Sequence, residues 1–101
     1  MPVVLPVHIK IKEDSLVARL AAKKLNSRNV AIVFGKTIHL YGVSRQSFLN
    51  NDAWVKHELK HVAQYQQHGF VPFLMKYILE WMRHGYHNNR FEIEAREAEL
   101  T

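Results

Sequence analysis

The residues of this chain most suited to chemistry lie in one short segment, His57-Glu58-Leu59-Lys60-His61. In a helix, residues four apart lie one turn apart on the same face, so both imidazoles can reach one metal ion. Glu58 is rotated about 100° from His57, where its carboxylate can face a water molecule instead of the ion. This HExxH pattern predicts a zinc site with His57 and His61 as metal ligands and Glu58 as the catalytic base.

A catalytic zinc site usually takes three protein ligands, so the sequence must supply one more. His68 lies about 10 Å beyond His61 along a continuous helix, which is too far to share the ion. The HExxHxxGxxH arrangement of metzincins is excluded, because glutamine stands where it requires glycine and the third histidine. The remaining candidates are Glu92 and Glu94, and helical periodicity alone does not choose between them.

The first half of the chain carries signals for one helix and one hairpin. A helix is expected from an N-cap at Asp14 or Ser15 to about Leu25. Two β-branched or alternating segments, residues 30–34 and 37–41, predict strands joined by a tight two-residue turn that contains a glycine. This region therefore supplies a sheet against which later helices can pack.

The second half of the chain is expected to be helical. The motif helix should run from Asn51 or Asp52 to His68, the next from Pro72 in its first turn to about His84, and the last from a cap at Asn88 or Asn89 to the C-terminus. One side of the motif helix gathers the residues expected to form the floor of a cleft, namely Trp54, His57, Glu58, His61 and Tyr65. The order helix, hairpin and three helices favours the α+β class.

Composition fits one folded domain spanning residues 1–101, with 48% hydrophobic and 23% charged residues. No cysteine is present, so any metal must be held by nitrogen and oxygen. The formal net charge is +5, but the basic residues are scattered, and no nucleic-acid partner is expected. Residues 1–10 lack the pattern of a secretion signal, which favours a cytoplasmic location.

The apolar run over residues 70–82 is too short to span a membrane. It predicts a helix buried in the core, with Lys76, Glu80 and Arg83 on a narrow solvent-facing stripe. An interaction surface for a partner is the alternative.

Residues 54–67 together with residues 91–98 resemble the gluzincin group, and in particular short bacterial zincin-like domains with HELxHVxQ followed by an ExEAR helix. The chain is more distantly similar to metallopeptidases of the IrrE/ImmA and prenyl-protease types. The resemblance implies a minimal zincin-like fold with Glu92 as the third zinc ligand, because Ala95 follows it at the spacing of E-x-x-A-[DN]. Arg96 departs from that pattern, which has Asp or Asn there.

The resemblance implies a zinc-dependent hydrolase that cleaves a peptide or protein substrate, with Glu58 moving the proton of the attacking water. Tyr86, His87 or Tyr65 can stabilise the oxyanion, and Tyr86 is the preferred candidate. Residues 37–41 are expected to form the edge strand that pairs with an extended substrate. The alternatives are a catalytically silent zinc-binding interaction module and a nucleic-acid-binding protein. The sequence does not predict an oligomeric state.

Overall fold

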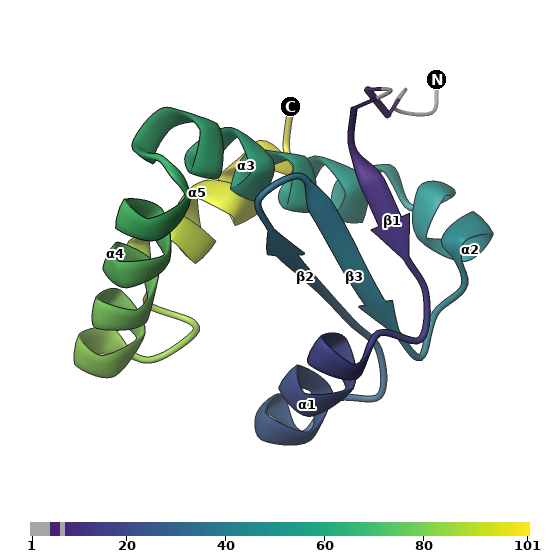
Figure 1. Cartoon of the computed structure of the whole chain (residues 1–101), viewed down its shortest axis with the longest axis horizontal. Helices are drawn as coiled ribbons and strands as arrows, with labels where there is room; N and C mark the ends of the chain where they lie inside the picture. Colours follow the sequence, from purple (N-terminus) through teal and green to yellow (C-terminus); the bar gives the residue numbers. More distant parts are fainter. Residues whose placement is uncertain (1–4, 7) are drawn as a thin grey trace.

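The computed structural model describes residues 5–6 and 8–101, which form three strands and five helices (Figure 1). Residues 1–4 and 7, part of the segment assessed for a secretion signal, lie outside the described residues. The elements follow in the order β1 (Lys10–Lys12), α1 (Leu16–Leu25), β2 (Val30–Phe34), β3 (Thr37–Tyr41), α2 (Arg45–Leu49), α3 (Asp52–His68), α4 (Phe70–His84) and α5 (Arg90–Ala98). The α+β class is confirmed, and every predicted helix and strand is present.

The sheet has the strand order β1-β3-β2. β2 and β3 form the expected antiparallel hairpin, closed by the pair Phe34 and Thr37. β1 adds a parallel partner on the other side of β3, with Ile11 opposite Ile38. The prediction that residues 37–41 form an edge strand was therefore wrong. β3 is central, and β2 lies at the edge.

Helices cover both faces of the sheet. α1 packs on one face, where Ala18 and Ala22 contact Val30. The larger core lies on the other face, where Ile38 and Leu40 are fully buried against α3. Alternation along β3 sends these two side chains to the same side, as the sequence predicted.

α2 was not predicted, because the segment before the motif helix reads as a polar loop. Ser44 caps this short helix by accepting a hydrogen bond from the backbone N–H of Ser47 at 3.1 Å. Its one buried side chain, Phe48, packs edge to face against Trp54 with ring centroids 5.3 Å apart. α2 thus packs against the first turn of α3 and supports it.

α3 carries the HExxH motif and has the predicted bounds. The Asn51 side chain accepts a hydrogen bond from the backbone N–H of Trp54 at 3.1 Å and so caps the N-terminus. Gly69 ends the helix with a φ of +88°, a conformation that favours glycine. Because the helix is continuous between these ends, the four-residue spacing places both histidines of the motif on one face.

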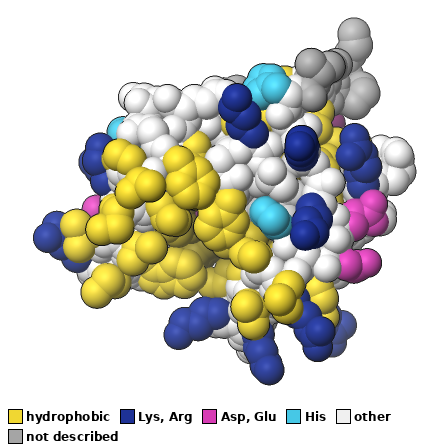
Figure 2. Space-filling model, in the orientation of Figure 1, with side chains coloured by type: hydrophobic (Ala, Val, Ile, Leu, Met, Phe, Trp, Pro, Cys, Tyr) yellow, Lys and Arg dark blue, Asp and Glu magenta, His cyan; other side chains and the backbone are white. Residues whose placement is uncertain are grey.

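α4 does not fit the prediction of a buried core helix. Only Phe73 is buried in it, whereas Val71 and Met75 are both 64% exposed and Met82 is 79% exposed. The helix packs on α3 and α5 through one stripe and leans away from the sheet (Figure 1). Most of its apolar surface therefore has no covering layer among the described residues (Figure 2). No helix in the described ranges is long and apolar enough to cross a membrane.

Gly42, which follows β3, lies close to the backbone at the base of the hairpin, and its substitution tests the packing there. A Cβ there would lie 2.0 Å from the carbonyl oxygen of Arg28, and φ is +78°. Gly85 has a φ of +79°, but apart from its two chain neighbours no described residue lies within 4 Å of its Cβ position. Positive φ should cost either alanine variant about 1–3 kcal/mol. We expect Gly42→Ala to lose more unfolding free energy than Gly85→Ala in urea titrations, and equal losses would contradict a role for the Arg28 contact.

Candidate metal centre

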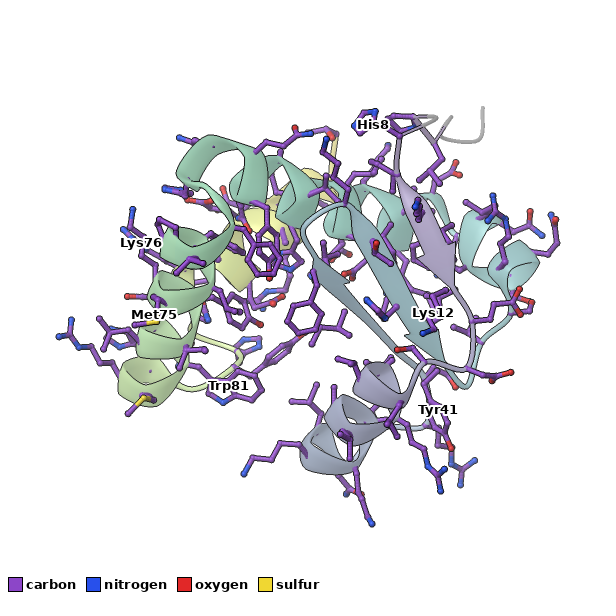
Figure 3. All side chains as sticks on the ribbon, viewed as in Figure 1. His8, Lys12, Tyr41, Met75, Lys76 and Trp81 are labelled. Atoms are coloured by element: carbon purple, nitrogen blue, oxygen red, sulfur yellow. The ribbon has the colours of Figure 1, made fainter. Side chains whose placement is uncertain are left out.

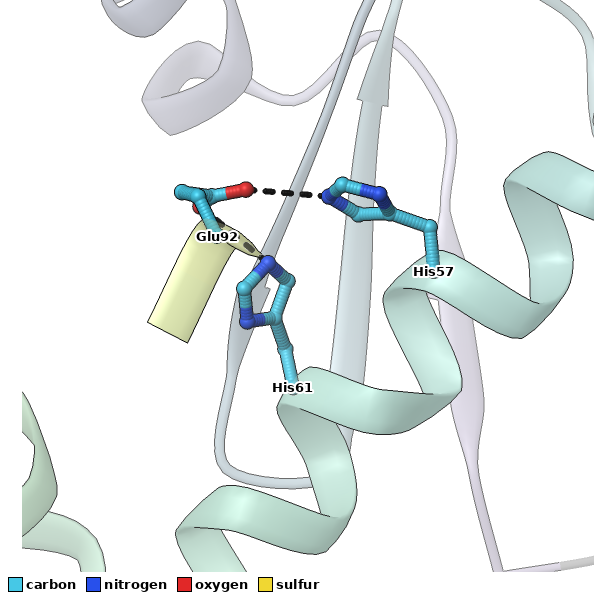
Figure 4. Close-up of side chains that lie close together, drawn as sticks. All are labelled: His57, His61 and Glu92. Carbon is cyan, nitrogen blue, oxygen red and sulfur yellow. Dashed lines mark hydrogen bonds and ion pairs between the residues drawn. The ribbon is translucent and has the colours of Figure 1, made fainter. Parts of the chain in front are cut away.

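Three side chains from two helices lie close together (Figure 4). His57 and His61 extend from α3, and Glu92 extends from the first turn of α5. The His57 Nε2 lies 3.0 Å from Glu92 Oε1, and the His61 Nε2 lies 3.1 Å from Glu92 Oε2. One donor atom from each residue falls within 4.8 Å of the others. The structure thus brings together the three residues expected to hold a metal.

The His61 ring is oriented by Gln64 one turn along α3. The Gln64 amide nitrogen donates to the Phe91 carbonyl at 3.2 Å and to Glu94 Oε1 at 2.9 Å. These bonds direct the amide oxygen toward His61 Nδ1, at 2.8 Å. Because that oxygen can only accept, Nδ1 must carry the proton when the ring is neutral. The Nε2 lone pair then faces the centre.

The His57 ring is oriented by Glu99, which lies just beyond α5. The Glu99 Oε2 is 2.6 Å from His57 Nδ1. A carboxylate at Nδ1 again keeps the proton on that nitrogen and leaves Nε2 for the centre. Both histidines therefore have the outer hydrogen bond that metal-bound histidines usually have.

Glu92 is the buried anion of the site, with only 3% of its surface exposed. The Tyr77 hydroxyl of α4 donates to its Oε2 at 2.5 Å. Burial disfavours the charged carboxylate, but hydrogen bonds from His57, His61 and Tyr77 outweigh it and hold the pKa of Glu92 well below its usual range. The carboxylate is thus ionised and available as an oxygen ligand.

The same contacts act on the imidazoles of the metal-free protein. Burial lowers the pKa of His57, but the hydrogen bonds to Glu92 and Glu99 and the charge of Glu58 outweigh it and raise that pKa to about 9. The pKa of His61 is raised for the same reason, with Glu92 again opposing the effect of burial. Without a metal, protons on the two rings therefore balance the buried negative charge.

Glu58 lies beside the cluster without joining it. Its Oε2 is 4.0 Å from His57 Nε2, and only 3% of its surface is exposed. Burial raises the pKa of Glu58 to about 7, although the nearby histidines favour its charged form. A carboxyl group with that pKa can both accept and return a proton near neutral pH.

The other residues considered from the sequence lie in different places. Glu94 is exposed on α5 and contacts Gln64, so it does not approach the histidines. Arg96 donates to the backbone carbonyl of His87 and so holds the loop before α5. His87 itself is exposed. The side chain at position 96 therefore contacts the backbone of that loop.

Two tyrosines named from the sequence line the cleft beside the centre. Tyr86 is 38% exposed and borders the hollow together with Glu58 and Glu92. Burial and the charges of Glu92 and Glu58 raise its pKa, so the phenol stays protonated and can donate a hydrogen bond. Tyr65 is buried within α3, and burial raises its pKa to about 12.

Sequence reasoning missed three residues that shape this site: Gln64, Tyr77 and Glu99. The spacing of Gln64 from His61, three residues along a helix, was a readable signal for their contact. Tyr77 was grouped with the apolar face of its helix, and Glu99 was assigned no role. Their contacts depend on how α4 and α5 cross α3, which periodicity does not specify.

The donor set fits zinc. Two imidazole nitrogens and a carboxylate oxygen form a common catalytic zinc set, which leaves a further position open. Metal–ligand bonds of about 2.0–2.2 Å in a tetrahedron place neighbouring donor atoms about 3.4 Å apart. Glu92 contacts the two histidines through different oxygens, at 3.0 and 3.1 Å, and one donor atom of each residue lies within 4.8 Å of the others. Small side-chain rotations would therefore bring three donors to that spacing.

Comparison with known proteins gives one match. A family model described as the eCIS core domain matches residues 7–69, more than half of the chain. That segment runs through α3 and includes His57, Glu58 and His61, whereas Glu92 and Glu99 lie outside it. No curated protein and no solved structure matches the chain. From the extent of the family match, the chain belongs to the eCIS core domain family.

Proposed function

We propose that this chain is a zinc-dependent hydrolase of the gluzincin type that acts on peptide bonds. The observation that carries the proposal is the convergence of His57, His61 and Glu92. The Nδ1 atom of each histidine is already hydrogen-bonded to an acceptor, which leaves Nε2 for the metal. A zinc ion held there would supply a Lewis acid that activates water and polarises a carbonyl group.

The chain's own groups have separate roles in this reaction. Glu58 accepts the proton of the attacking water and returns it to the leaving amine, for which its pKa of about 7 is suited. Tyr86 donates a hydrogen bond to the developing oxyanion from the wall of the cleft. Tyr77 bonds to Glu92 and holds the carboxylate in place.

The edge of the sheet offers a place for the substrate backbone. β2 is one of the two edge strands of the β1-β3-β2 sheet, and its residues line the hollow that contains the candidate metal ligands. An extended peptide can add to such an edge through main-chain hydrogen bonds. The substrate strand is therefore assigned to β2 instead of β3.

Metal content tests the ligand set. We expect protein purified without an affinity tag to bind zinc near one equivalent, measured by mass spectrometry. His61→Ala and Glu92→Gln should lose it, because each removes a donor, whereas the exposed Glu94→Gln should retain it. Circular dichroism checks that each variant folds. Zinc retained by Glu92→Gln but lost by Glu94→Gln would contradict the assignment.

Glu58→Gln tests catalysis separately from metal binding. This variant keeps the shape of the buried side chain but removes the base. We expect full zinc content and a cleavage rate about 10²–10⁴-fold lower on a quenched peptide library. If the wild type carries zinc but cleaves no more than Glu58→Gln, the chain is a catalytically silent zinc-binding module.

Glu99→Gln tests the outer hydrogen bond to His57. Loss of the carboxylate should lower zinc affinity about 10–100-fold, measured by competition with a chromophoric chelator. Glu97→Gln is the matched control, because Glu97 is exposed two residues earlier in the chain. Equal affinities for the two variants would show that Glu99 does not orient the ligand.

A further inference from the structure

The hollow above the metal centre continues into an apolar cleft between α1 and α4. The hollow and the cleft form one continuous space with a total volume of about 310 Å³. α1 contributes Ala21 and Leu25, whereas α4 contributes Leu74, Ile78 and Trp81. Figure 3 shows Trp81 extending from α4 toward α1. The hydrophobic side chains gathered around this hollow are visible in Figure 2.

The cleft separates into a polar floor and apolar walls. The acidic and imidazole side chains of its lining are those of the centre and its base, namely His57, Glu58, His61 and Glu92. The walls above them consist of aliphatic and aromatic residues from α1, β2 and α4. A charged group entering between these walls would lose water without gaining a partner, whereas an apolar group would be stabilised.

The continuity of the cleft with β2 and the metal centre indicates what occupies it. A peptide added to the β2 edge sends alternate side chains to opposite sides of its strand. Side chains on one of these sides would enter the space between α1 and α4, because β2 lines that same space. An engineered cavity of about 150 Å³ holds benzene, so this cleft has room for an aromatic or branched aliphatic side chain.

We propose that the cleft between α1 and α4 is a specificity subsite that binds a bulky apolar side chain of a peptide extended along β2. This inference rests on the proposed function for the identity of the substrate as a peptide. It also gives one exposed apolar residue of α4 a role, because covering Ile78 with the chain's own core would close the cleft. The subsite itself requires no zinc.

The test measures binding without cleavage. The probes are fluorescein-labelled octapeptides of glycine, serine and threonine with one central variable residue: phenylalanine, leucine, alanine or aspartate. Fluorescence anisotropy is recorded with the zinc-loaded Glu58→Gln protein and again after chelation. We expect the phenylalanine and leucine peptides to bind at least tenfold more tightly than the alanine and aspartate peptides.

Two substitutions on α4 locate the effect. Ile78 and Leu79 are both 45% exposed, but only Ile78 lines the cleft. Ile78→Asp should weaken binding of the phenylalanine peptide at least tenfold, because it places a charge in the apolar wall. Leu79→Asp introduces the same charge on the same helix outside the cleft and should leave binding unchanged.

The outcomes separate this inference from the proposed function. Equal affinity for all four peptides, undetectable binding of every peptide, or equal effects of the two substitutions would overturn the subsite. Zinc content measured on the same samples is independent of these results. If the protein takes up no zinc when zinc is supplied but still prefers the apolar peptides, the subsite is supported and the metal-dependent hydrolase is rejected.

Discussion

The arrangement of the C-terminal half depends on the burial of one carboxylate. Glu92 is almost fully enclosed, and a buried charge is strongly destabilising unless it is paired and hydrogen-bonded. His57, His61 and Tyr77 supply that pairing from α3 and α4. The three helices must therefore meet at this point, and a metal ion would replace the protons that balance the charge in the metal-free protein.

A second set of hydrogen bonds keeps α5 in the register that this pairing requires. Asn89 is fully buried, caps α5 through the backbone N–H of Phe91 and donates to the Tyr77 carbonyl of α4 at 3.1 Å. Gln64 links α3 to the Phe91 carbonyl. Phe91 and Ala95 fill the space beneath these bonds. Apolar packing thus sets how deeply α5 is buried. The hydrogen bonds of the Asn89 and Gln64 side chains set where α5 lies along its own axis, and so place Glu92 opposite the histidines.

The sequence predicted the features that depend on local contacts and missed those that depend on packing between distant elements. Strong local signals at Ser15, Asn51 and Gly69 predicted the helix ends, because caps act within a few residues. β1 was missed because a Lys-Ile-Lys segment carries one apolar residue and pairs only through distant β3. That omission produced the wrong edge strand. The choice between Glu92 and Glu94 likewise depends on the rotation of α5 against α3, which was taken from family resemblance instead of periodicity.

α4 differs from α5 in that most of its apolar surface is not buried by packing. One stripe, Phe73 and Tyr77, satisfies its packing on the neighbouring helices, and the rest of its apolar surface stays exposed. Exposed apolar area on this scale gives no folding free energy, because it remains in contact with water. A helix fully packed onto β2 would bury that area, but it would also cover Glu92 and the histidines. The open position of α4 is therefore what keeps His57, His61 and Glu92, the candidate metal ligands, accessible from the cleft.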